Sequence, residues 1–129
     1  MKLLLDTHVW LWWVTAPERL GPGAAAAMQD PRNELLFSVA SSWEIAVKYS
    51  IGKLELPEPP EEFVLKRLRR DGIDTLHIEH RHTLRVASLP LHHRDPFDRL
   101  LIAQAQIEAI PIITVDLKFR PYPVTILWE

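Results

Sequence analysis

The sequence contains no cysteine, which excludes disulfide bonds and thiolate chemistry. It also lacks a long apolar run. The run near the start of the chain covers only residues 3–5 before Asp6 interrupts it, which is too short for the core of a signal peptide. No segment approaches the length of a membrane span. These absences favour a cytoplasmic protein without a membrane segment.

The sequence has little net charge as well. Its 15 Lys and Arg residues nearly balance its 17 Asp and Glu residues, and the formal net charge is -2. Net charge therefore gives no support for nucleic-acid binding, which would have to come from local patches. The 129 residues are 47% apolar and 25% charged, as in a globular protein with one core. We expect one domain covering residues 1–129.

Short apolar runs alternate with helical patterns along the chain. The runs predict strands at residues 2–5, 35–37, 73–78, 112–115 and 124–127, the last of them at an edge of the sheet. Helices are predicted at residues 9–14, 24–29, 38–50, 61–71, 79–88 and 96–109. This alternation is typical of an α/β protein in which helices cover a parallel sheet of about five strands.

Residues 93–103 carry the most informative local pattern. Asp95 suits the N-cap of a helix, and Pro96 suits its first position, where no N–H is needed. Asp98 then falls in the first turn and shares a face with Leu101 and Ile102. That face is apolar and should point inward. An acid at its head either complements the helix dipole or belongs to a buried site.

Three further acids are predicted to lie near Asp98. Asp6 and Asp116 directly follow the first and fourth predicted strands, and Glu44 lies in the second turn of the helix after the second strand. In a parallel α/β sheet, strand ends and the following helix N-termini share one edge, where ligands bind. Clustered carboxylates repel one another unless a cation lies between them. A site with oxygen ligands only, and without cysteine, favours Mg²⁺ or Mn²⁺ over Zn²⁺.

Each of these acids also has a purely structural interpretation. Asp6 suits the cap of the helix that follows it. Glu44 has Lys48 four residues further on, which is the spacing of a surface ion pair. Asp116 suits a turn after a strand.

The motifs and their order resemble the PIN-domain endoribonucleases, specifically the VapC-type toxins of type II toxin–antitoxin systems. The matching segments are 4–8 (Leu-Leu-Asp-Thr-His), 41–48 (Ser-Ser-Trp-Glu-Ile-Ala-Val-Lys), 52–54 (Gly-Lys-Leu), 95–105 (Asp-Pro-Phe-Asp-Arg-Leu-Leu-Ile-Ala-Gln-Ala) and 114–116 (Thr-Val-Asp). The Asp-Pro-Phe-Asp-Arg segment with its upstream histidine is specific, whereas the opening Leu-Leu-Asp-Thr is weaker on its own.

The resemblance implies a three-layer α/β/α, Rossmann-like sandwich with an acidic pocket. Asp6, Glu44 and Asp98 match the three core acids of the family, and Asp116 matches a more variable fourth. These four are the expected catalytic residues and metal ligands. The resemblance further implies Mg²⁺-dependent cleavage of RNA phosphodiester bonds, a homodimer, and inhibition by a cognate antitoxin that fills the pocket. In this hypothesis Asp6 and Asp98 hold the ion, and Glu44 and Asp116 complete or support the site.

RNA binding requires cationic groups near these acids. Arg94 and Arg99 flank Asp98 in the sequence, and we expect them to contact the substrate phosphates. The basic run at residues 66–70 is better interpreted as a solvated helix face. His8 is expected to pack against its helix, and His92 and His93 are expected to be solvated loop residues.

Three tryptophans crowd the first helix. Trp10, Trp12 and Trp13 cannot all face the same core, because neighbouring positions on a helix point in different directions. At least one is therefore expected at the surface or at an interface with a second copy or the antitoxin.

Two other function classes remain open. A signalling receiver also gathers acids and Mg²⁺ at a sheet edge, but it has an acidic pair after its first strand, where this chain has Thr7 and His8. A catalytically silent PIN-like module would bind RNA or protein only. Its mark would be a missing core acid, and none is missing.

Overall fold

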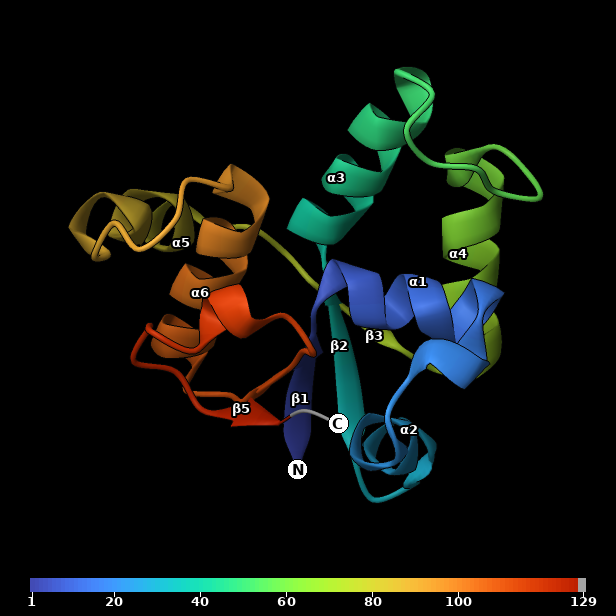
Figure 1. The fold of residues 1–129 in the computed structure, drawn as a ribbon, viewed down its shortest axis with the longest axis horizontal. Helices are drawn as coiled ribbons and strands as arrows, with labels where there is room; N and C mark the ends of the chain where they lie inside the picture. Colours follow the sequence, from blue (N-terminus) through green and yellow to red (C-terminus); the bar gives the residue numbers. More distant parts are fainter. Residues whose placement is uncertain (128–129) are drawn as a thin grey trace.

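The computed structural model describes residues 1–127, which form a five-stranded parallel sheet flanked by helices (Figure 1). The strands are β1 (Lys2–Leu5), β2 (Glu34–Ser38), β3 (Asp74–Leu76), β4 (Ile112–Ile113) and β5 (Ile126–Leu127), in the order β3-β2-β1-β4-β5. Every neighbouring pair is parallel. The predicted α/β/α class with about five parallel strands is confirmed, and β5 lies at an edge as expected.

The central strand β1 faces two hydrophobic cores. Successive side chains of a strand point to opposite faces of the sheet. Leu3 and Leu5 accordingly join one core, and Leu4 joins the other. Because both faces of β1 are covered, a continuous apolar run occupies this strand rather than an alternating one.

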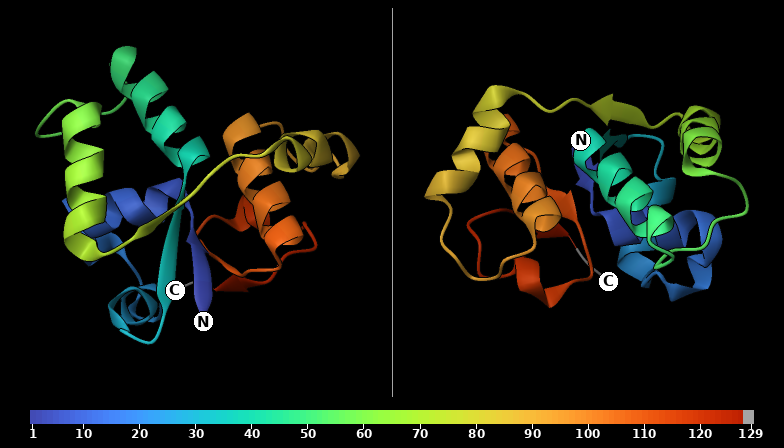
Figure 2. Two further views of the ribbon diagram at one scale, coloured as in Figure 1. Left: turned by 180° about the vertical axis from the view of Figure 1, so that it is seen from behind. Right: turned by 90° about the horizontal axis from the view of Figure 1, so that it is seen from above.

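The helices divide between the two faces of the sheet. α1 (Thr7–Thr15), α2 (Pro22–Gln29) and α4 (Pro60–Asp71) contribute buried residues to the core around Leu3 and Leu5, and α6 (Pro96–Glu108) to the other core. α5 (His80–Arg85) packs on α6. α3 (Val39–Ser50) contacts both α4 and α6 and lies between the two groups (Figure 2). None of the helices in residues 1–127 is long and apolar enough to cross a membrane.

Several elements are shorter than the sequence predicts. The helix predicted at 79–88 divides into α5 and a 3₁₀ turn, Val86–Ser88. The strand predicted at 112–115 ends at Ile113, although the Thr114 backbone N–H still bonds to the Leu127 carbonyl oxygen of β5 (3.0 Å). The strand predicted at 73–78 covers only Asp74–Leu76.

Candidate active site

Two of the acids lie at the ends of adjacent central strands. Asp6 follows β1, and Asp116 lies three residues beyond the end of β4, its parallel neighbour. Thr114 joins them: its Oγ1 donates to Asp6 Oδ2 (2.8 Å) and accepts from the Asp116 backbone N–H (3.0 Å). Asp6 is only 1% exposed and its side chain caps no backbone N–H of α1. The capping interpretation of Asp6 is therefore wrong.

Glu44 reaches the same edge from α3. The serine at the start of this helix caps it, since Ser38 Oγ accepts from the Ala40 backbone N–H. Glu44 is 1% exposed, and Lys48 Nζ bonds to its Oε2 at 2.5 Å. The predicted ion pair between Glu44 and Lys48 is present, but Glu44 is buried rather than on the surface.

Asp98 enters from the first turn of α6. Asp95 is the N-cap of that helix, as predicted, because its Oδ1 accepts from the Asp98 backbone N–H (3.0 Å). The Asp98 side chain is thereby left to face inward, where it is 6% exposed. Its Oδ2 lies 3.0 Å from His93 Nε2.

The four acids influence one another electrostatically. Burial, together with the charges of Asp6, Asp95, Glu44 and Asp116, raises the pKa of Asp98 to about 8. Burial likewise raises the pKa of Asp6 to about 6, in spite of the hydrogen bond from Thr114. Repulsion of this kind requires short separations, so the structure brings the four predicted acids together.

The donor set fits a hard divalent cation. Asp6 Oδ1 and Glu44 Oε1 are buried and have no hydrogen-bond partner among the described residues. A buried charged oxygen without a partner is costly, and a cation would satisfy both atoms and favour the ionised acids. All four side chains offer oxygen only, which matches Mg²⁺ or Mn²⁺ better than softer metals.

The sequence pattern did not place His93 in the site. Tyr122 Oη accepts from the His93 backbone N–H (3.2 Å) and from Arg99 Nη1 (3.1 Å), and its own proton has two acceptors, His93 Nδ1 at 2.7 Å and the His93 carbonyl oxygen at 3.4 Å, of which the shorter contact favours Nδ1. These contacts assign the proton of the neutral ring to Nε2, which then donates to Asp98 Oδ2. His93 is therefore a fixed neutral donor to Asp98 and not the solvated loop residue expected from the sequence.

Arg99 does not lie where a substrate contact requires it. Its side chain is buried (8% exposed), and its guanidinium donates to the carbonyl oxygens of Pro90, Val86 and Leu89. These bonds hold the loop between α5 and α6, so the predicted phosphate contact is wrong for Arg99 on grounds of accessibility. Arg94 is exposed in the same loop, and its substrate contact stays a prediction.

A hollow of about 250 Å³ opens onto the acids. It is lined by Asp6, His8, Trp12, Val115 and Asp116. His8 is exposed there, so the expectation that it packs against its helix is wrong. Trp10 is fully buried in the core around Leu3 and Leu5, and Trp12 and Trp13 are half-buried and pack against the same core, so the expectation that the three indoles cannot share one core is wrong.

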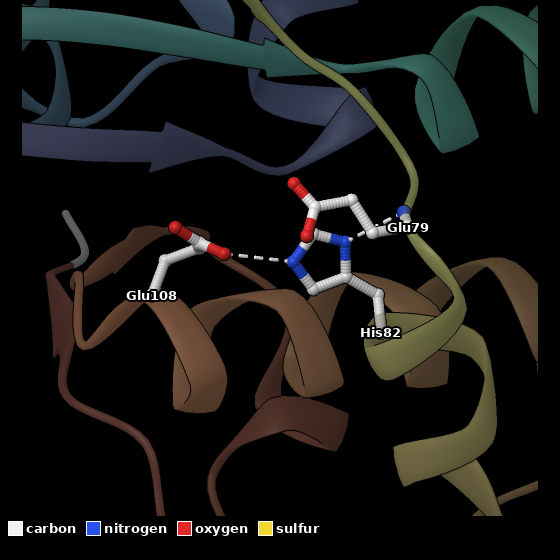
Figure 3. Close-up of side chains that lie close together, drawn as sticks. All are labelled: Glu79, His82 and Glu108. Carbon is white, nitrogen blue, oxygen red and sulfur yellow. Dashed lines mark hydrogen bonds and ion pairs between the residues drawn. The ribbon is translucent and has the colours of Figure 1, made fainter.

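A second acidic cluster lies away from this edge (Figure 3). Ligand atoms of Glu79, His82 and Glu108 lie within 4.8 Å of one another. The Glu79 backbone N–H donates to His82 Nδ1 (3.0 Å), which leaves the proton on Nε2 to bond Glu108 at 2.8 Å. Arg81 pairs with both glutamates at 2.6 Å. Arg81 offsets one of the two negative charges, and its pairs with Glu79 and Glu108 fasten α5 to α6.

A family profile of the PIN domain matches residues 3–124. The chain belongs to the PIN-domain family. Ribonuclease VapC22 of Mycobacterium tuberculosis is 30% identical over 131 residues, which cover 96% of this chain and 97% of that protein. Ribonuclease VapC16 of the same organism is 50% identical over 58 residues, so the match spans 45% of this chain and only 41% of that relative. The predicted resemblance to VapC-type PIN domains is confirmed.

Solved structures share this PIN fold. VapBC2 from Rickettsia felis, bound to a DNA fragment from its promoter, aligns with a TM-score of 0.71 and 16% identity over the whole of both chains. FitAcB from Neisseria gonorrhoeae aligns with a TM-score of 0.57 and 17% identity, over 96% of this chain and 95% of that one.

Proposed function

We propose that this PIN domain is a Mg²⁺-dependent endoribonuclease and the toxin of a type II toxin–antitoxin pair. The observation that supports this most directly is the edge at which four acids influence one another electrostatically, where one buried oxygen each of Asp6 and Glu44 has no hydrogen-bond partner within residues 1–127. The relatives in Mycobacterium tuberculosis are named ribonucleases, which agrees with this chemistry.

Asp6 and Asp98, with Glu44 and Asp116 in support, would hold the Mg²⁺ ion, and Mn²⁺ would suit the same oxygens. A divalent cation supplies Lewis-acid stabilisation of the charge on a scissile phosphate. The chain's own residues position the acids: Thr114 fixes one oxygen of Asp6, Lys48 fixes one of Glu44, and the Nε2–H of His93 fixes one of Asp98.

The partner proposals follow from the family and the neighbours. Structures of this fold include the VapBC2 assembly and a toxin–antitoxin complex from Klebsiella pneumoniae. We propose that this chain likewise binds a cognate antitoxin and forms a homodimer. Residues 1–129 would act as one PIN domain in the cytoplasm.

The test is cleavage of RNA by purified protein that is free of any co-purified partner. We expect total RNA to be cut in the presence of Mg²⁺ and to remain intact with EDTA. Asp98→Asn should reduce the rate by about a hundredfold to a thousandfold, because one preorganised charge of the site is lost. Arg70→Ala, on the exposed face of α4, is the control and should cut like the wild type.

The outcome that contradicts the proposal is a folded wild type that binds RNA but does not cut it under any divalent cation. Such a protein would be the catalytically silent binding module considered above.

A further inference from the structure

A second hollow adjoins the acids on the side of α1 and the end of α3. We call it the basic groove. It has a volume of about 430 Å³ and is lined by His8, Leu11, Trp12, Thr15, Arg19, Lys48, Lys53 and Leu54. His8 and Trp12 also line the hollow that contains Asp6 and Asp116. The two hollows therefore share one wall, and the basic groove leads to the candidate active site.

The charge of the basic groove is opposite to that of the acidic edge. Arg19, Lys48 and Lys53 line it, and none of its lining residues is an acid. In a chain of net charge -2, this is a local concentration of cations. Lys48 already pairs with Glu44, so Arg19 and Lys53 are the cations that remain for a ligand. Both are exposed.

The backbone holds Lys53 at the groove. α3 ends in a turn at which Gly52 has a φ of 75°, a conformation that suits glycine. The Gly52 N–H bonds the Tyr49 carbonyl (3.1 Å), and the Lys53 N–H bonds the Lys48 carbonyl (2.9 Å). This is the double hydrogen bond of a Schellman motif, which fixes the direction of the chain after the helix.

Trp12 supplies an aromatic surface at the junction of the two hollows. Its ring is half-buried, and the guanidinium carbon of Arg19 lies 4.6 Å from the ring centroid. Single-stranded nucleic acids bind to sites that combine a cationic groove with aromatic side chains on which bases stack. A paired helix offers no free base face for such stacking.

We propose that the basic groove binds a single-stranded segment of the RNA substrate and leads it to the acidic edge. Arg19, whose guanidinium lies over the Trp12 ring in the free protein, moves to a phosphate beside the one that Lys53 contacts, and a base takes its place on that ring. This inference rests on the proposed ribonuclease function. It places the substrate on the α1 and α3 side of the acids, whereas Arg99 on the α6 side is buried in its own loop.

Equilibrium binding of a fluorescein-labelled, single-stranded RNA of mixed sequence tests this, with Asp98→Asn as the non-cleaving parent and Mg²⁺ present throughout. Adding Arg19→Ala and Lys53→Ala should weaken binding about tenfold or more. The slope of log K against log salt should fall by about 1.4, because two phosphate contacts are lost at about 0.7 each for a single strand. The matched control adds Arg69→Ala and Arg70→Ala, two exposed cations of α4, and should bind like the parent.

Trp12 is tested separately, because a stacking contact contributes no salt dependence. Trp12→Leu should weaken binding about tenfold at an unchanged salt slope, which is within the range of one stacked base. Trp12→Tyr keeps an aromatic face and should recover most of the affinity. Thermal unfolding of each variant checks that the fold is intact.

The outcomes separate this inference from the proposed function. If the parent binds RNA and the Arg19, Lys53 and Trp12 variants bind equally well, the basic groove is not the substrate path, while the ribonuclease proposal stands. If the parent binds no RNA, both are overturned. If the Arg19 and Lys53 variant keeps its affinity for RNA but loses affinity for a polyglutamate peptide, the groove is a site for an acidic polypeptide and the inference is wrong.

Discussion

Two acidic clusters of this molecule differ in how their charge is balanced. Glu79 and Glu108 both pair with Arg81 at 2.6 Å, and the proton on His82 Nε2 is directed to Glu108. At the acidic edge, Asp98 has only the neutral His93 as a side-chain partner among the described residues, and one oxygen each of Asp6 and Glu44 has none.

The difference separates a structural cluster from a candidate site. By ligand distances alone, Glu79, His82 and Glu108 form the tighter group. Yet Arg81 pairs with both glutamates and His82 bonds Glu108, so a metal ion would have to displace partners that the protein already supplies. The acids around Asp98 are left with raised pKa values that a cation would lower. Unsatisfied charge therefore identifies the functional cluster better than proximity does.

After Asp98→Asn itself, the largest effect on RNA cleavage is expected from the loss of a neutral residue that supports the acidic edge. Tyr122→Phe removes the hydroxyl that fixes the His93 ring and so loosens the donor to Asp98. Loss of a residue that orients a metal ligand through a hydrogen bond typically lowers metal affinity or activity about 10- to 100-fold. We expect RNA cleavage to fall by that factor, measured as initial rates over a series of Mg²⁺ concentrations. Tyr49→Phe, on the exposed end of α3, is the control. Unchanged rates for Tyr122→Phe would show that Asp98 needs no such support.

The second prediction concerns stability against pH without metal. The pKa of Asp98 is about 8 in the folded protein and near 3.8 in an unfolded chain, so the folded state binds more protons between these values. Stability must therefore fall as the pH rises through this range. Burial lowers the pKa of His93, so this group makes stability rise with pH. Its contribution is complete above the pKa of an unfolded histidine, about 6.5, and does not offset the effect of Asp98 at higher pH. Between pH 6.5 and 8 we expect a loss of about 1–2 kcal/mol in EDTA.

Mg²⁺ should reverse this loss. The ion binds the ionised acids and stabilises by about 2–3 kcal/mol at a hundredfold excess over its dissociation constant. Thermal unfolding at pH 6.5 and 8, with and without Mg²⁺, measures both effects. The groups that face Asp98 and contribute to its titration are Asp6, Glu44, Asp95 and Asp116, with Lys48 as the nearby cation. A metal-free protein that is more stable at pH 8 than at pH 6.5 would contradict the assignment.

The smallest effect is expected at the cluster of Glu79, His82 and Glu108, whose acids already pair with Arg81. Glu108→Gln keeps an acceptor for His82 and leaves Arg81 its pair with Glu79. We expect a loss of about 1 kcal/mol in the free energy of unfolding and no change in RNA cleavage. Asp98→Asn should show the opposite pattern, with a loss of RNA cleavage and a gain in stability. In metal-free protein at pH 8 it removes an unsatisfied charge and should raise the unfolding temperature. If Glu108→Gln abolished cleavage, the comparison of the two clusters would fail.

Sequence reasoning located the acids because their placement follows from topology. Once β1 and β4 are parallel strands, Asp6 and Asp116 must lie at one edge of the sheet, whatever the loops do. Asp95 as N-cap and Asp98 as an inward acid follow from helix periodicity and capping alone. Such features are local, or they depend only on strand order.

The misassigned residues depend on how loops pack. Arg99 lies beside an acid in the sequence, but its guanidinium binds carbonyls of residues 86–90, whose positions no local pattern reveals. His93 joins the site through Tyr122, 29 residues further along. His8 is exposed although its neighbours Thr7 and Val9 are buried, because it lies on the outward face of α1.

The hydrogen bond between Thr114 and Asp6 joins residues that are 108 positions apart. A chain that has been synthesised only as far as α6 already contains Asp6, Glu44 and Asp98, but it lacks β4, and with it the hydroxyl that orients Asp6. The acidic edge therefore takes its final form only after β4 and Thr114 have been made and β4 has paired with β1.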